Sequence, residues 1–484
     1  MKKLEKQSTL TFAELPPTQF GLLNGEANCD FYSAIRLPSR AIPALAGVLN
    51  TDGWSDIQEI NPLYHGIRGK LSAENFKRIF DSDVLLISSI TRTSMQSMKL
   101  ADLYKAKNPY GMVIAGGPDA TFRIKDWLEH VDIVVRGEGE RTIKELMEEL
   151  TKERPDLKTI DGIAFKENGS VIITEQRKLM AAEELSKLPH PYYDKTIRQK
   201  VASMVVEASR GCPNNCDFCS VTEIYGRVYR QKSKKYVIEE LEEIEKVGKY
   251  CFFTDDNIAA NQSKTIELLE EIKKHSVKRE KIAQITIAAA FNDGLLKALK
   301  KAGFLHLCIG IESIVDETLE FFGKPYKADK IKEAINIYRD NGFWVHGMMM
   351  LGGDGDTPET LEETGQWIGK NLDSVQLFTP IPIPGTRFYD RMEQEGRILT
   401  KEWYLYDGQH VVIRPKNFTP YWLQKKIYRM YRKFYSFKNS FLRNLGSRKM
   451  NRSMIFSFYA NFLAKKFFKN PQLDSHLEFL KSVS

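Results

Sequence analysis

The stretch that decides the fold is Arg210-Gly211-Cys212-Pro213-Asn214-Asn215-Cys216-Asp217-Phe218-Cys219. Its three cysteines have the spacing C-x3-C-x2-C, on a Gly-, Pro- and Asn-rich loop that follows an apolar run at residues 204–208. Thiolates grouped in a short loop can hold an iron–sulfur cluster. In a cluster of four irons, three cysteine ligands leave one iron without a protein ligand. That iron can bind a small molecule. The stretch therefore predicts a [4Fe-4S] cluster with one open coordination site.

Zinc is the other metal that grouped cysteines hold. A closed structural zinc site takes four ligands, usually as two spaced pairs. No fourth ligand lies near this loop, since the nearest other cysteine is Cys251. A chance group of buried thiols would not occupy a polar loop. We therefore favour iron, and we interpret Cys29, Cys251 and Cys308 as ordinary core thiols.

Length and composition set the broad class of the protein. The chain has 484 residues, which predicts two or three domains, and 42% hydrophobic residues, which is enough for packed cores. No apolar stretch reaches the ~18 residues of a spanning helix, and residues 1–7 are charged, unlike a signal peptide. Six cysteines, three of them in one loop, indicate a reducing compartment. We therefore expect a cytoplasmic protein.

The positive charge is concentrated at the carboxyl-terminal end. Residues 421–484 hold 14 Lys and Arg against two acids, a net charge of +12 within an overall charge of +8, and 15 aromatic side chains. Cations and aromatics on one helix suit an anionic membrane surface, although RNA binding by stacking uses the same composition. We expect residues 421–436 to form a helix that closes the preceding domain. Residues 437–470 predict peripheral contact with the inner face of a membrane, and no nucleic acid partner is expected.

Strands and helices alternate over residues 12–152. Strands are expected at residues 20–24, 57–60, 84–88, 113–115 and 133–136, and helices include residues 41–49 and 140–150. This alternation predicts an α/β domain with a doubly wound parallel sheet, covered by helices on both faces. Ligands of such sheets bind at the carboxyl ends of the strands. The sequence places three polar or glycine-rich motifs there, Ser88-Ser89-Ile90-Thr91, Gly116-Gly117-Pro118 and Arg136-Gly137-Glu138-Gly139-Glu140.

A connector is expected over residues 153–200, with a hairpin at residues 162–175 around the turn signal Asn168-Gly169. The alternation then returns over residues 201–400. Six strands are expected there, at residues 204–209, 251–254, 284–288, 305–310, 345–351 and 374–378. This pattern predicts a partial (β/α)6 barrel with its active-site groups at the carboxyl ends of the strands. A helical extension over residues 401–484 completes the expected organisation.

The cysteine loop and its place after the first strand of the barrel resemble the radical S-adenosylmethionine (SAM) superfamily. In that family the open iron chelates the amino and carboxylate groups of SAM. An electron from the cluster then splits SAM into methionine and a 5′-deoxyadenosyl radical. The resemblance implies a [4Fe-4S] cluster on Cys212, Cys216 and Cys219, SAM as a cofactor, and Phe218 as a cofactor-binding residue. It also implies a reducing electron donor such as flavodoxin or ferredoxin.

Motifs at the ends of later strands extend this resemblance. Thr254-Asp255-Asp256-Asn257 offers carboxylates to the ammonium group of SAM, although Asp and Asn also favour strand ends as turn residues. Glu312, followed by Ser313, can accept hydrogen bonds from the ribose diol of SAM, or simply begin a helix. Gly352-Gly353 lets adenine or methionine approach the backbone closely. The cofactor-binding candidates of the barrel are therefore Asp255, Asp256, Glu312, Ser313, Gly352 and Gly353. Residues 380–386, PIPIPGT, resemble a PxPGT stretch of one branch of the family.

The first domain resembles the cobalamin-binding domain that precedes the radical SAM core in B12-dependent members. Leu37-Pro38 with the helix at residues 41–49, the Ser-rich strand end and the two glycine motifs carry this resemblance. It implies bound cobalamin in contact with Ser89, Thr91, Gly116 and Gly117. A plain flavodoxin-like domain with a tight turn is the alternative.

One feature departs from the general cobalamin pattern. The D-x-H-x-x-G loop, whose histidine ligates cobalt, is absent, since residues 24–30 contain no histidine. His65 follows the second expected strand, and we do not assign it to cobalt. Many B12-dependent radical SAM proteins lack this histidine, so we expect a corrinoid without a histidine ligand. The departure also leaves open that the domain binds no cobalamin.

The extension beyond residue 403 resembles the carboxyl-terminal part of the branch that includes the hopanoid C-2 methylases and anaerobic Mg-protoporphyrin ester cyclases. The resemblance rests on residues 406–411, 414–416 and 431–436. His410 either faces the active site or packs as a structural histidine.

The leading hypothesis is a cobalamin-dependent radical SAM enzyme. A deoxyadenosyl radical removes hydrogen from an unactivated carbon, and the carbon radical takes a methyl group from methylcobalamin, which a second SAM regenerates. We expect a small-molecule substrate of lipid-like character. The alternatives are an oxidative cyclase without methyl transfer and a non-catalytic corrinoid or iron–sulfur binding protein. A methylthiotransferase needs a second cysteine triad in the first domain, where only Cys29 is present.

Overall fold

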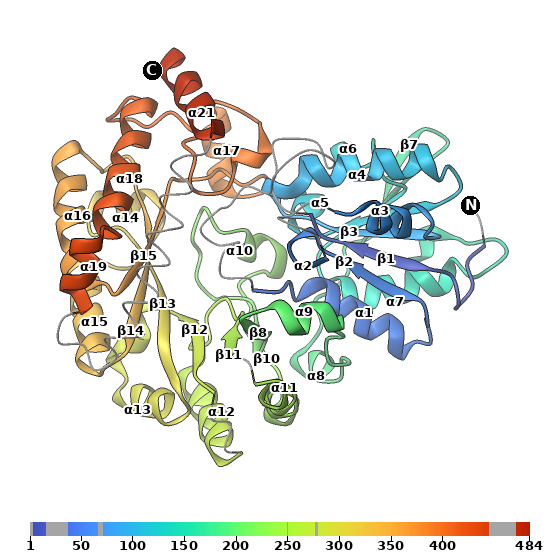
Figure 1. Cartoon of the computed structure of the whole chain (residues 1–484), viewed down its shortest axis with the longest axis horizontal. Helices are drawn as coiled ribbons and strands as arrows, with labels where there is room; N and C mark the ends of the chain where they lie inside the picture. The colour runs from blue at the N-terminus through green and yellow to red at the C-terminus, as the bar shows by residue number, and fades with distance from the viewer. Residues whose placement is uncertain (1–2, 16–36, 66–70, 249, 276–278, 445–470) are drawn as a thin grey trace. The chain divides into compact units, whose positions relative to one another are not determined.

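The computed structural model describes residues 3–15, 37–65, 71–248, 250–275, 279–444 and 471–484 (Figure 1). The chain forms two compact units that meet in sequence at Val205 and Val206. Each unit is built around its own sheet. The boundaries of the four expected domains remain predictions.

The first unit holds a seven-stranded sheet with the order β2-β1-β3-β4-β5-β6-β7. The first five strands along the chain are parallel: β1 (Leu10–Ala13), β2 (Ile57–Ile60), β3 (Val84–Ser88), β4 (Met112–Gly116) and β5 (Ile133–Val135). Because side chains alternate between the faces of a strand, the sheet contributes to two separate cores. Helices α1 (Ala41–Thr51) and α7 (Gly139–Glu149) cover one face, and α3 (Ala73–Phe80) and α4 (Ser94–Lys107) cover the other. The doubly wound α/β fold is therefore confirmed.

Two details of this sheet differ from the expectation. The strand expected at residues 20–24 lies outside the described residues. Strand β1 was not predicted, because its four residues, between the charged residues 1–7 and Pro16-Pro17, give only a weak signal. The sheet is also not purely parallel. The predicted hairpin is present as β6 (Ile163–Glu167) and β7 (Ser170–Ile173), and it adds two antiparallel strands beside β5. A two-residue turn, with φ of 50° at Asn168 and 80° at Gly169, reverses the chain and so imposes this direction.

The second sheet has six strands in the order β8-β11-β12-β13-β14-β15, which is their order along the chain, and its first strand, β8, spans the boundary between the units. They are β8 (Ser203–Val206), β11 (Tyr250–Phe253), β12 (Lys281–Ile285), β13 (Phe304–Glu312), β14 (Trp344–Met350) and β15 (Ser374–Phe378). The connecting helices include α11 (Lys234–Lys246), α12 (Gln262–Lys274), α13 (Asp293–Lys301), α14 (Asp316–Phe321), α15 (Ala328–Asp340) and α16 (Pro358–Asn371). This sequential βα order is that of the expected partial barrel.

One barrel strand begins earlier than expected. Lys281 opens β12 although it is fully buried, and its Nζ donates to the carbonyl of Arg279 at 2.9 Å. A charged residue at this position concealed the start of the strand. Residues 287 and 288, which the expected strand included, belong instead to a 3-10 turn over Ile287–Phe291.

The extension closes the free edge of β15. The extension contains helix α18 (Pro420–Phe434), in agreement with the expected helix at residues 421–436. The phenolic oxygens of Tyr431 and Tyr435 accept from the N–H groups of Leu377 at 2.6 Å and Val375 at 3.0 Å. These bonds occupy backbone groups that an edge strand otherwise exposes.

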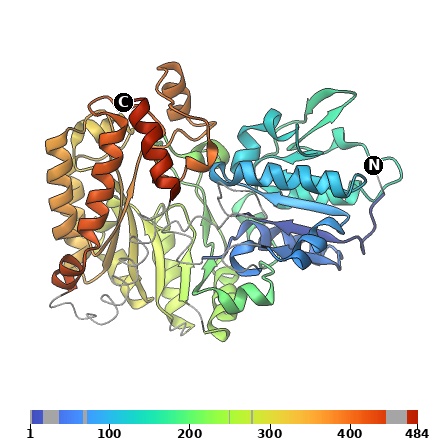
Figure 2. The same cartoon turned by 45° about the horizontal axis from the view of Figure 1, so that its top comes forward.

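Further helices follow α18. They are α19 (Phe437–Asn444) and α21 (Pro471–Ser482) (Figure 2). Another helix of this region, α17 (Arg387–Gln394), comes before α18 in the chain. Within the described parts of the chain, no helix has the length and apolarity to span a bilayer. Membrane contact was predicted for residues 437–470, and of these residues 445–470 lie outside the described part of the chain.

Candidate functional site

The cysteine loop lies between a two-stranded ribbon and a short helix in the second unit. Strand β9 (Ser209–Arg210) pairs with β10 (Arg230–Gln231) directly before the loop, and α10 (Ser220–Tyr225) begins directly after Cys219. Gly211 has a φ of 89°, and a Cβ there would lie 2.1 Å from the carbonyl oxygen of Val228. Only glycine fits this turn, so the entry to the loop is fixed by its backbone.

Backbone N–H groups point at two of the three thiols. The amide of Asn214 donates to Cys212, and the amides of Val221 and Thr222 donate to Cys219. Burial raises the pKa of all three thiols, that of Cys219 to about 11, while these amides act in the opposite direction. Metal binding deprotonates such thiols, and hydrogen bonds to sulfur tune an iron–sulfur cluster. Because the pKa values are raised, the thiolate form of this loop depends on bound metal, and the amides directed at sulfur fit a cluster.

The three thiols do not form a site for a single metal ion. Across the described ranges, no three His, Cys, Asp or Glu side chains converge as the ligands of one ion would. Three thiolates that serve a four-iron cluster bind three different irons, so they need not converge. The donor set of this loop fits such a cluster.

Asp255 and Asp256, which follow β11, hold the backbone that leads into the loop. The carboxylate of Asp255 accepts from the amide of Ala208 at 3.0 Å and from the hydroxyl of Ser209. Asp256 accepts from the amide of Gly211 at 3.0 Å. Burial raises the pKa of Asp255 to about 7. Both carboxylates thus position the loop, and their predicted contact with the ammonium group of SAM stays a prediction.

Glu312 ends β13 in an uncommon conformation. Its φ is 61°, and the register with β14 shifts between Gly310 and Glu312. Such left-handed backbone costs a non-glycine residue on the order of 1–3 kcal/mol and is often found at functional sites. The side chain is nearly buried, and its carboxylate pairs with the ammonium group of Lys324 at 2.9 Å. The strained backbone therefore holds a carboxylate in a fixed place at the barrel's carboxyl edge.

Lys324 connects this carboxylate to the cysteine loop, and the sequence reading missed it. Its Nζ lies 5.8 Å from the ring centre of Phe218, within cation–π range. Burial by itself would lower the pKa of Lys324, but the charges of Glu312 and Cys216 raise it, and the net direction is upward. Cys216, Phe218, Glu312 and Lys324 thus form one group. The only sequence signal was a charged residue between Gly323 and Pro325 in the loop after α14.

Three other barrel candidates make contacts within the protein. The hydroxyl of Ser313 accepts from the amide of Val315 at 3.0 Å, which is a local turn. Gly352 has a φ of 100°, and both it and Gly353 donate to Asp356, at 2.7 and 3.2 Å.

Neighbouring side chains already occupy the space beside the two glycines. A Cβ would lie 2.4 Å from Leu423 at Gly352 and 2.8 Å from Thr318 at Gly353. These glycines therefore permit close packing, and contact between them and a cofactor stays a prediction.

The four candidates of the first unit gather at the carboxyl ends of β3 and β4. The amide of Ser89 donates to the carbonyl of Gly116 at 3.1 Å. Gly117 has a φ of 94°, and a Cβ there would lie 2.6 Å from the carbonyl oxygen of Ser89. Thr91 is buried and hydrogen-bonds to Asp119. The structure thus brings the four residues to one edge of the sheet.

This edge offers both open backbone and apolar surface. Gly116 and Gly117 are half-buried, and a Cβ on Gly116 would meet no atom closer than 3.5 Å. Ile90 and Met95, at the same edge, are 44% and 37% exposed. A bare glycine backbone beside exposed apolar side chains fits a large, partly apolar ring with a polar tail, as in cobalamin.

His65 and His410 are engaged in structural contacts. In His65, Nδ1 accepts from the amide of Asn61 at 3.0 Å and Nε2 contacts Asp194 at 3.1 Å, so neither nitrogen is free for cobalt. His410 is buried, and its Nδ1 lies 3.0 Å from the carboxylate of Asp407. These contacts favour the structural reading of His410.

Comparison with known proteins matches both halves of the chain. The B12 binding domain matches residues 36–147, and the Radical SAM superfamily matches residues 206–368. An uncharacterized methyltransferase of Pyrococcus horikoshii is 32% identical over 74% of this chain and 79% of its own length.

Two further relatives have named reactions. An anaerobic magnesium-protoporphyrin IX monomethyl ester cyclase of Cereibacter sphaeroides is 25% identical over 84% of this chain and 68% of its own. A hopanoid C-3 methylase of Methylococcus capsulatus is 29% identical over 65% of this chain and 61% of its own. The resemblance drawn from the sequence motifs is thereby confirmed.

The fold also has a solved counterpart. The radical SAM methyltransferase TsrM of Kitasatospora setae, solved with cobalamin and a [4Fe-4S] cluster bound, superposes with a TM-score of 0.63. The match covers 80% of this chain and 78% of that one at 14% identity. At this identity the likeness concerns the fold, and it agrees with the α/β architecture expected from the sequence.

Proposed function

Because the chain belongs to the cobalamin-binding radical SAM methyltransferase family, whose cofactors are a [4Fe-4S] cluster, SAM and cobalamin, we propose that it methylates an unactivated carbon of a lipid-like substrate. When bound, the cluster supplies the electron that cleaves SAM, and cobalamin supplies the methyl group. The observation that carries the proposal is the cysteine loop beside the buried Glu312–Lys324 pair, in one chain with a B12 binding domain.

The residues of the second unit divide the work around SAM. Cys212, Cys216 and Cys219 hold the cluster, and the amides directed at their sulfurs support this assignment. Asp255 and Asp256 hold the loop in place through its backbone. Glu312, kept in position by Lys324, accepts hydrogen bonds from the ribose of SAM.

The proposed substrate class rests on the relatives and on the tail. The hopanoid methylase and the protoporphyrin ester cyclase are both named for large, mainly apolar ring molecules. The basic and aromatic carboxyl-terminal segment supports contact with an anionic membrane, where such molecules reside. A flavodoxin or ferredoxin delivers the electron.

SAM with a deuterated methyl group tests the proposed reaction. Loaded, reduced protein is incubated anaerobically with this SAM and with lipid extracts. We expect a product that has exchanged one hydrogen for a deuterated methyl group, detected by mass spectrometry. The protein without cobalamin is the control and should give no such product. A product that has only lost hydrogen would identify a cyclase, which the cyclase relative makes the second candidate.

Glu312→Gln tests the assignment of the SAM ribose. A hydrogen bond to a charged group contributes about 1.5–3 kcal/mol, so SAM should bind on the order of tenfold to a hundredfold more weakly. Iron content should stay near that of the unaltered protein, because Glu312 contacts a substrate and not the metal. Equilibrium dialysis of SAM and iron analysis measure the two quantities. Glu320→Gln, on the exposed face of α14, is the matched control; equal SAM affinity in both variants would show the assignment to be wrong.

A further inference from the structure

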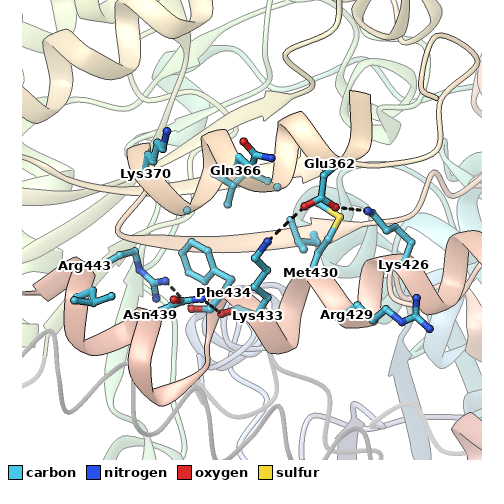
Figure 3. A pocket seen from close by; sticks show the side chains of 15 residues that line it. Glu362, Gln366, Lys370, Lys426, Arg429, Met430, Lys433, Phe434, Asn439 and Arg443 are labelled. Carbon is cyan, nitrogen blue, oxygen red and sulfur yellow. Dashed lines mark hydrogen bonds and ion pairs between the residues drawn. The ribbon is translucent and has the colours of Figure 1, made fainter. Parts of the chain in front are cut away.

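A groove runs between three helices of the second unit, away from the residues assigned to SAM. It has a volume of about 490 Å³ and lies between α16, α18 and α19 (Figure 3). Leu377 of β15 with Met430 and Phe434 of α18 gives it an apolar lining. Gly369 of α16 opens it further, because a Cβ there would meet no atom within 4 Å. This volume lies within the ~300–1,000 Å³ typical of small-molecule sites. We call this space the cationic groove.

Basic side chains outnumber acids around the cationic groove. Its lining includes five cations, Lys370, Lys426, Arg429, Lys433 and Arg443, and one carboxylate, Glu362. Glu362 pairs with Lys426 at 2.6 Å and with Lys433 at 3.5 Å. Figure 3 marks both pairs with dashed lines. Within the described part of the chain, no carboxylate lies within ion-pair distance of Lys370, Arg429 or Arg443. Asp373 lies beside Lys370 and Arg443 in the adjoining pocket and offsets part of this charge, so the groove keeps an excess of positive charge.

Arg443 is the most unusual of these cations. Its guanidinium lies 3.6 Å from the ring centre of Phe434, and its Nη1 donates to the carbonyl of Phe434 at 2.6 Å. Its Nε and Nη2 are buried without a hydrogen-bond partner among the described residues. Buried N–H groups of an arginine ordinarily have acceptors, and phosphate and carboxylate oxygens are those that match its fork. Protein covers these donors, so Arg443 contributes positive charge beneath the groove and not an exposed contact.

Helix α19 adds an exposed apolar surface next to these cations. Phe437 is 64% exposed, Phe441 42% and Leu442 54%. Phe437 and Phe441 are four residues apart and so lie on one face of the helix, and Leu442 also lines the groove. Exposed aromatic and aliphatic side chains beside cations are typical of helices that lie in a membrane interface. The two features together describe an amphipathic ligand, with an anionic head and an apolar tail.

We propose that the cationic groove and the exposed face of α19 bind an anionic phospholipid at a bilayer surface. The phosphate lies against Arg429 and Lys433, with the charge of Arg443 beneath them, and the first carbons of an acyl chain lie over Leu377 and Met430. This proposal rests on the membrane contact proposed above and gives that contact a binding site. It does not depend on whether the enzyme methylates or cyclises its substrate. It commits to a lipid and not to a free anion, because a free phosphate does not use the apolar lining.

Vesicle co-sedimentation of the full chain tests this site. We expect binding to phosphatidylcholine vesicles that contain phosphatidylglycerol, weak binding to pure phosphatidylcholine, and loss of binding as salt is raised. Arg429→Gln combined with Lys433→Gln should reduce the affinity on the order of tenfold, since each cation at an anionic surface contributes measurably. Lys297→Gln combined with Lys300→Gln, on exposed positions of α13, removes the same charge elsewhere and should leave most of the binding.

Gly369→Leu tests the groove without changing any charge. The added side chain enters open space on a helix, where leucine is more favourable than glycine, so the fold should be kept and vesicle affinity should fall severalfold. SAM cleavage, measured in the same variants, should be unchanged, which separates this proposal from the proposed function. Equal losses in the groove and α13 variants would overturn the site. Displacement by inorganic phosphate alone, or tighter binding of an oligonucleotide than of vesicles, would also overturn it.

Discussion

Protein carrying Cys216→Ala should contain no [4Fe-4S] cluster after anaerobic reconstitution and should release no 5′-deoxyadenosine from SAM. The reason is that each of the three cysteines supplies one protein ligand, and two ligands do not hold a four-iron cluster with an open iron. Cys212→Ala and Cys219→Ala should behave in the same way. Iron and sulfide analysis and the visible absorbance of the cluster measure the first effect, and chromatography of the nucleoside measures the second.

Cys251→Ala is the matched control for the cysteine variants. Cys251 is a fully buried thiol of β11 in the same unit, and we interpret it as part of the core. This variant should keep its cluster and lose only a little stability, because alanine leaves a small cavity. A normal cluster in protein that lacks all three loop cysteines would contradict the metal assignment.

Gly117→Ala should lower the amount of bound cobalamin at least severalfold. The positive φ of Gly117 disfavours any side chain, and a methyl group there would press on the carbonyl of Ser89 at the edge where we expect the corrinoid. Purified protein incubated with cobalamin and passed through a desalting column gives the bound amount from its corrin absorbance. The cobalt(II) form should show the electron paramagnetic resonance spectrum of a corrinoid without a histidine ligand.

Two other glycines of the same unit provide a control and a second test. Gly53 has a φ of 92° with no atom within 4 Å of a Cβ, so Gly53→Ala introduces comparable backbone strain away from the edge. It should lower the melting temperature and still bind cobalamin. Gly116→Leu introduces a side chain at the edge without a positive φ, and it should block cobalamin while keeping the fold. Normal cobalamin binding by Gly116→Leu would show that the ligand does not use this edge.

The regular parts of the fold could be predicted from the sequence because their signals are local. Strands β2, β3 and β15 have the expected bounds, since each is a short run with clear turn residues on both sides. The cysteine spacing is equally local. Strand β1 could not be predicted because it is only four residues long. The start of β12 could not be predicted because the strand begins with a buried lysine.

The contacts within the candidate site could not be predicted, because they join residues that no local sequence pattern links. Lys324 reaches Glu312 across α14, and no periodicity marks it as a partner. The carboxylates of Asp255 and Asp256 turn to the backbone of residues 208–211, more than 40 positions earlier. A strand-end acid looks the same in the sequence whether it faces a cofactor or the protein's own amides.

The cofactor dependence of the two nucleoside products decides whether the chain is a cobalamin-dependent radical SAM methyltransferase. Reduced protein loaded with its cluster and cobalamin is incubated with SAM and a lipid extract, and both nucleoside products are quantified. We expect 5′-deoxyadenosine from radical cleavage together with S-adenosylhomocysteine from methyl donation. The first product should be lost without the loop cysteines, and the second should be lost without cobalamin. Release of 5′-deoxyadenosine with no cobalamin-dependent S-adenosylhomocysteine would contradict this assignment.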